Sequence, residues 1–114
     1  MKIKNSDLVR FFNASDAIMA KKMPRKLYAK IDLNIRNLMN AAEAYSAQRQ
    51  DIFKDSSEVT PEMQAELSEL LNLEIDVMVQ TISENDLGIM DESDKYDAFT
   101  GDEYKALDFM IETE

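Results

Sequence analysis

Basic side chains gather in the first third of the chain, where their spacing suits contact with an anion. They are Lys21, Lys22, Arg25, Lys26 and Lys30. Lys22, Lys26 and Lys30 are four positions apart, which places them on one face of a helix. Such a face contacts phosphates, and Tyr28 beside it offers a ring on which a base stacks. The last four of these basic residues are candidate anion contacts of a nucleic-acid-binding module, although a solvated or internally paired face explains them more simply.

The second polar cluster is acidic and runs from residue 84 to residue 103. It holds Glu84, Asp86, Asp91, Glu92, Asp94, Asp97, Asp102 and Glu103. A calcium loop needs alternating oxygen ligands and a glycine at its bend, whereas Asp91, Asp94 and Asp97 are three apart with no such glycine. We therefore predict no metal site here. A further hypothesis is that these three aspartates imitate the phosphates of a nucleic acid and inhibit a host or defence protein.

Catalytic chemistry has little support in the composition. The chain contains no cysteine and no histidine, which excludes thiol nucleophiles, disulfides, imidazole bases and the usual zinc ligand sets. Glu62 and Glu66 form a carboxylate pair, but we expect them on an exposed helix face without an apolar pocket to tune a pKa. The sequence has no glycine-rich phosphate loop. We therefore predict that the protein is not an enzyme and binds no cofactor.

Charge divides the chain into two halves. Residues 1–54 hold 11 Lys and Arg against 5 Asp and Glu, whereas residues 55–114 hold 2 against 18. This polarity favours folding of the halves onto each other, or pairing of basic and acidic faces between copies. The chain has 114 residues, 45% of them apolar, and no stretch long enough to span a membrane. We expect a single soluble domain in the cytoplasm.

Glycine and proline are rare, at two residues each, so a helix-dominated fold is expected. Apolar residues recur at helical spacing over about residues 6–21, 24–54, 61–72 and 101–112. Pro24 and Pro61 suit the first helical position, where no N–H is needed. Thr100 and Glu103 form a capping box that begins the last helix. The acidic stretch before it, residues 83–100, is expected to be irregular.

One segment has the period of a strand. Residues 73–81 alternate apolar with polar side chains, which is typical of a half-buried strand. A lone strand leaves its backbone unpaired, so it needs a neighbour. Residues 1–4, residues 87–90 and the same strand of a second copy are the candidates. The predicted fold class is helix-dominated α+β, a long antiparallel helical hairpin built on residues 24–54 with a small β-sheet.

The long predicted helix carries a heptad-like apolar seam. Its members are Tyr28, Ile31, Ile35, Leu38, Ala42, Tyr45, Arg49 and Ile52. A helix over residues 24–54 is about 45 Å long, and we expect one small chain to leave part of the seam uncovered. The exposed seam would then drive association, so a homo-oligomer is predicted, most simply a two-fold dimer. The candidate interaction surface is Tyr28, Ile35, Tyr45, Ile52 and the strand residue Met78.

Several segments together resemble an uncharacterised family of small bacteriophage and prophage proteins. They are MKIKNSDLV at the start, KKMPRKLYAKIDLNIRNL and AYSAQRQDI in the long helix, and EIDVMVQTI and DEYKALDFMIE later. The resemblance covers most of the chain and implies a phage or prophage origin. It carries over no activity, cofactor or catalytic residue, because its motifs are structural. The loop over residues 55–60 is shorter than in that family and is not expected to hold a shared function.

The function predicted first is that of a non-enzymatic, phage-encoded interaction or assembly protein that binds a phage or host protein. It would act in the cytoplasm of the host cell or become incorporated into the virion. The nucleic-acid mimic of residues 84–103 is the first alternative. The nucleic-acid-binding module of residues 21–30 is the second.

Overall fold

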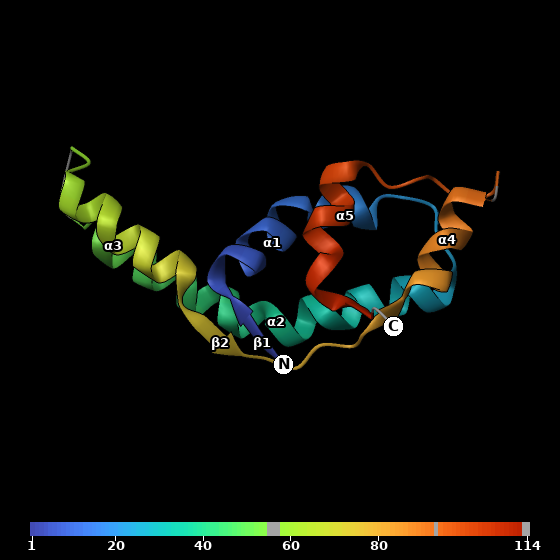
Figure 1. The fold of residues 1–114 in the computed structure, drawn as a ribbon, viewed down its shortest axis with the longest axis horizontal. Helices are drawn as coiled ribbons and strands as arrows, with labels where there is room; N and C mark the ends of the chain where they lie inside the picture. Colours follow the sequence, from blue (N-terminus) through green and yellow to red (C-terminus); the bar gives the residue numbers. More distant parts are fainter. Residues whose placement is uncertain (55–57, 93, 113–114) are drawn as a thin grey trace.

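The long helix α2 (Arg25–Ile52) runs along most of the length of the molecule (Figure 1). It has 28 residues and is therefore about 42 Å long, in a molecule whose extents are 50 × 26 × 22 Å. The computed structural model describes residues 1–54, 58–92 and 94–112. The predicted fold class is confirmed, because helices dominate and the strands are short and few in the described part. Pro24 precedes α2 as its N-cap residue and is not its first residue.

Helix α1 (Asn5–Met19) packs along α2. Leu8, Phe11 and Ile18 on its inner face are at most 1% exposed, as are Ile31 and Leu38 on the facing side of α2. Burying a side chain of this size contributes roughly 1.5–3 kcal/mol. Helix α5 (Gly101–Leu107) covers α1 from the same side of α2 (Figure 1). These three helices hold the best-buried part of the core.

Helix α3 (Pro61–Asn72) returns along the far end of α2 and makes the expected antiparallel hairpin (Figure 1). We call residues 43–54, which are the end of α2 and the two residues after it, together with α3 the arm. Thr60 caps α3, since its hydroxyl accepts a hydrogen bond from the Met63 N–H at 3.2 Å. Leu70 is buried, whereas the other large apolar side chains of the arm are half-buried, namely Tyr45, Ile52, Phe53, Met63, Leu67 and Leu71. The arm is therefore less well covered than the rest of the molecule.

The apolar seam of the long helix was expected to stay partly uncovered, but the same chain covers most of it. Ile31 and Leu38 are 0% exposed, and Ile35 and Tyr45 are half-buried against the core of the same chain. The reason is that α1 lies directly along this face of α2. Ile52 is half-buried in the arm, and Tyr28 stays 43% exposed. The premise that one chain cannot hide this seam was therefore wrong for all but its ends.

Strand β1 (Lys2–Lys4) pairs antiparallel with β2 (Glu74–Asp76), with Ile3 opposite Ile75. Residues 1–4 are thus the neighbour of the predicted strand. The predicted strand over residues 73–81 is shorter than expected, however, because β2 ends at Asp76 and the last hydrogen bonds to the start of the chain are those of Val77 with Met1, at 2.8 and 3.1 Å. Beyond it, the side chain of Asn34 on α2 takes the place of a neighbouring strand. Asn34 accepts from the Gln80 N–H at 2.7 Å and donates to the Gln80 carbonyl at 2.9 Å.

Two expectations for the last third of the chain were wrong. Helix α4 (Glu84–Glu92) occupies part of the stretch expected to be irregular. It forms because the Ser83 hydroxyl accepts from the Asp86 N–H at 3.1 Å and because Leu87 and Met90, one turn apart, are both buried. The helix expected over residues 101–112 ends at Leu107. A 3₁₀ turn, η1 (Asp108–Met110), and strand β4 (Ile111–Glu112) follow, and β4 pairs parallel with β3 (Ile82–Ser83).

Candidate functional site

The turn between α1 and α2 is clasped to the segment before α5. The Lys22 N–H donates to the Asp97 carboxylate at 2.8 Å, and the Asp97 N–H donates to the Lys22 carbonyl at 3.0 Å. This pair of hydrogen bonds joins residues that are 75 positions apart. It fixes the position of residues 94–97 against the start of α2.

A second contact strengthens this clasp. The Lys21 ammonium lies 3.2 Å from the Glu103 carboxylate and donates to the Ala98 carbonyl at 3.0 Å. Glu103 also accepts from the Thr100 N–H at 2.7 Å, which completes the predicted capping box of α5. Burial alone would raise the pKa of Glu103. The hydrogen bonds from Thr100 and Lys21, with the charge of Lys21, outweigh it and hold that pKa below its ordinary value.

The clasped segments form a depression of about 380 Å³, which we call the basic pocket. Its walls are Lys21, Lys22, Met23, Arg25, Tyr28, Lys95 and Tyr96. Among the described residues, no ion pair involves the side chain of Lys22, of Arg25 or of the neighbouring Lys26. The first turn of α2 has no acidic residue, so the positive end of the helix dipole adds to their field. The pocket is therefore a cationic surface with two tyrosine rings.

The structure separates the four candidate anion contacts. Lys22 and Arg25 line the basic pocket, and Lys26 is exposed one position further along α2. Lys30 is engaged elsewhere, because its ammonium donates to the Thr81 carbonyl at 3.3 Å and lies 3.8 Å from the Asp86 carboxylate. The expected shared helix face of Lys22 with Lys26 was wrong, since α2 begins only at Arg25.

Sequence reasoning missed two walls of the basic pocket, Lys95 and Tyr96. They follow α4 and are about 70 positions from Lys22 along the chain, so no local spacing connects them. A hint was present, because Lys95 is one of only two basic residues in the acidic half of the sequence. An isolated basic residue in an acidic segment is the sequence signal that could have indicated this site.

The acidic candidates do not gather in the same way. Asp94 is exposed, and the carboxylate of Asp97 serves the clasp. The side chain of Asp91 lies outside what the structure describes. No group of three or more acidic side chains suited to a metal ion occurs among the described residues. The mimicry hypothesis for these aspartates stays a prediction.

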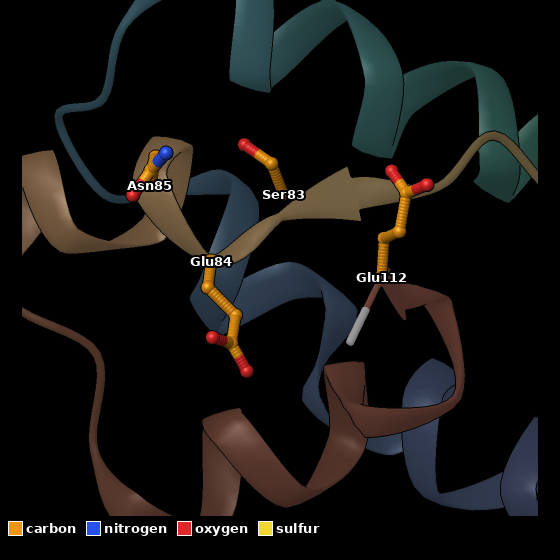
Figure 2. Close-up of a pocket in the computed structure, with 4 residues that line it drawn as sticks. All are labelled: Ser83, Glu84, Asn85 and Glu112. Carbon is orange, nitrogen blue, oxygen red and sulfur yellow. The ribbon is translucent and has the colours of Figure 1, made fainter. Parts of the chain in front are cut away.

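A smaller pocket of about 90 Å³ lies where β3, the start of α4 and β4 meet, and Figure 2 shows its lining residues, Ser83, Glu84, Asn85 and Glu112. The side chains of Glu84 and Glu112 point in opposite directions (Figure 2). The Ser83 hydroxyl is already used to cap α4. An acid–base pair needs two groups that converge on one reacting bond. These carboxylates therefore form no such pair.

The remaining interaction candidate, Met78, is 73% exposed on the extended segment after β2.

In the described part of the chain, no helix combines the length and the apolar character that crossing a membrane requires. Comparisons with protein-family models, curated proteins and solved structures found no match to this chain.

Proposed function

We propose that this is a non-enzymatic interaction protein whose basic pocket binds an acidic segment of a partner protein. One observation carries the proposal. The chain has 23 acidic residues and a net charge of −10, yet Lys22, Arg25 and Lys26 form no ion pair among the described residues. Cations left unpaired in so acidic a protein, around a hollow surface, provide a local attraction for carboxylates.

The extent of the surface favours a protein segment over a nucleic acid. A nucleic acid is held by a row of phosphate contacts along a basic track. Here the track is short, because Lys30 is ion-paired with Asp86 and the exposed Asp94 lies just before Lys95. Three or four carboxylates on one or two helical turns match a surface of this size. Met23 and the two tyrosines offer the apolar contact that a protein side chain uses.

The biological setting is part of the same proposal. The resemblance to small phage and prophage proteins supports a phage-encoded accessory that contacts a phage or host protein in the cytoplasm of the host cell. The genes next to its own provide a test. Tail or capsid genes as neighbours support a role in assembly or in the virion, whereas early genes support contact with a host protein.

Binding is tested with two labelled probes, a short oligoglutamate peptide and an oligothymidylate of equal charge, by fluorescence anisotropy at low salt. We expect oligoglutamate to bind the wild-type protein and K22E/R25E/K26E to weaken that binding about tenfold or more, since three exposed charge contacts each contribute roughly 0.5 kcal/mol. The matched control K2E/R10E/K54E makes the same charge change at three exposed positions away from the pocket.

The control separates a local site from net charge. If both triple variants weaken binding equally, the pocket is not the site and the proposal fails. Stronger, pocket-dependent binding of oligothymidylate would replace the protein partner with a nucleic acid.

A further inference from the structure

The outward face of α3 carries the charge opposite to that of the basic pocket. Glu62, Glu66 and Glu69 are four and three positions apart, so they share one face, and all three are exposed. No Lys or Arg occurs anywhere in residues 55–94. Val59, just before the helix, is 59% exposed. This face of α3 is therefore acidic, with an exposed apolar residue just before the helix.

This acidic face and the basic pocket cannot meet within one chain. The pocket is built at the first residues of α2 and on the segment after α4, whereas α3 lies at the opposite end of the molecule from α4 (Figure 1). The intervening helix α2 is about 42 Å long. At physiological salt, charges separated by much more than about 8 Å hardly interact. Each end thus keeps its charge unless another molecule supplies the counterpart.

We infer that the acidic segment bound by the basic pocket is α3 of a second copy of this chain. This inference names the partner in the proposed function and rests on it. Two elongated copies lying antiparallel bring the pocket of each to the α3 of the other, so the same contact forms twice about a two-fold axis. The three glutamates span about 10 Å along α3, a length comparable with the surface presented by Lys22, Arg25 and Lys26.

The apolar parts of the two surfaces also correspond. Val59 offers a small apolar side chain to the wall formed by Met23, Tyr28 and Tyr96. The arm itself is half-buried, so a second copy lying along it covers apolar surface that α2 and α3 leave accessible. Charge then sets the register of the pair, and apolar contact adds to its affinity.

Sedimentation velocity on the full chain tests the pairing. The wild type is expected to sediment as a dimer at low salt and to dissociate as salt is raised. E62K/E66K/E69K reverses the arm, and K22E/R25E/K26E reverses the pocket. Each variant alone then places like charges together and is expected to be monomeric. Mixed in equal amounts, they restore both contacts and are expected to form a mixed dimer.

Recovery on mixing also shows that the variants fold, and circular dichroism checks each one separately. The control D16K/E74K/E112K makes the same charge change as the arm variant at three exposed positions outside the arm and the basic pocket and is expected to stay dimeric. A monomeric wild type, single variants that still dimerise, or a mixture that stays monomeric each overturns the inference. Species heavier than a dimer that grow with concentration overturn the antiparallel arrangement.

The outcome separates this inference from the proposed function. A monomeric wild type whose pocket still binds oligoglutamate removes the second copy but leaves the pocket as a site for another acidic protein. Loss of pocket-dependent binding removes both.

Discussion

The arm and the rest of the described molecule, which we call the body, share the same long helix, yet they are stabilised differently. In the body, α1 covers α2 so that Ile31 and Leu38 are 0% exposed, and side-chain hydrogen bonds clasp distant segments together. In the arm, α3 covers α2 with half-buried side chains and one buried leucine, Leu70. Continuity of a helix therefore says little about how firmly its two ends are held. The body has a fully buried core, whereas the arm leaves most of its large apolar side chains half-buried.

Matched leucine truncations give the largest expected contrast between body and arm. Leu38→Ala removes a fully buried side chain and is expected to lower the free energy of unfolding by about 2–5 kcal/mol. Leu67→Ala in the arm removes a half-buried side chain and is expected to cost about 1 kcal/mol. Denaturant titration of both variants measures the difference. Equal losses would show that the arm is packed as tightly as the body.

The Asn34 amide gives the next largest effect. Replacing it with leucine leaves the Gln80 N–H and carbonyl without the partners at 2.7 and 2.9 Å. Unsatisfied backbone groups of this kind cost about 1–3 kcal/mol. Hydrogen exchange should quicken at the Gln80 amide, and Asn40→Leu, at an exposed position of the same helix, is the control. An unchanged exchange rate at Gln80 would contradict the role of Asn34 as a substitute for a strand.

Within the arm, the cap of α3 has a smaller effect. Thr60→Ala removes the acceptor of the Met63 N–H and is expected to lower stability by about 1 kcal/mol. Ser68→Ala, on the exposed part of the same helix, is expected to change it by less than about 0.5 kcal/mol. Faster exchange at the Met63 amide in the first variant, and not in the second, would locate the effect at the start of α3.

The clasp of the body predicts a pH dependence. The pKa of Glu103 is lower in the folded protein than the ordinary value of a glutamate, so the unfolded chain takes up the proton first as pH falls. The stabilisation by ionised Glu103 is therefore fully present above that ordinary value and is lost as pH falls through the folded pKa. Glu103→Gln should be less stable than the wild type at neutral pH, and the gap should narrow in acid. A gap that is constant between neutral pH and strong acid would contradict this.

Much of the helical framework could be predicted from local sequence. Pro24 and Pro61 mark the starts of α2 and α3, and Thr100 with Glu103 marks α5, because caps and prolines act within one turn of the chain. Helix α4 was missed because its acidic residues and Gly88 outweighed the one-turn spacing of Leu87 and Met90. Its stability comes from burial against other elements, which local spacing does not report.

The predictions of the strand and of the basic pocket were incomplete for a related reason. The alternation of residues 73–81 gave the half-buried positions Ile75, Val77 and Val79, although Leu73 on the same face is 50% exposed. It did not give the end of β2 at Asp76 or the hydrogen bonds of Gln80 with the distant Asn34. Only part of the basic pocket could be predicted from the sequence. Lys22 and Arg25 stood out as a cluster, whereas Lys95 and Tyr96 are brought beside them by long-range contacts such as that of Asp97 with Lys22.

That contact between Lys22 and Asp97 has a consequence for any molecule that enters the pocket. Its walls come from both sides of a chain loop more than 70 residues long, so an occupant that touches Arg25 and Tyr96 together acts as a cross-link between the two chain segments. Because such an occupant binds only when the loop is closed, it must raise the melting temperature and slow proteolysis of both segments, and this stabilisation grows with the logarithm of its concentration above the dissociation constant. Thermal stabilisation can thus serve to screen for partners before any of them has been identified.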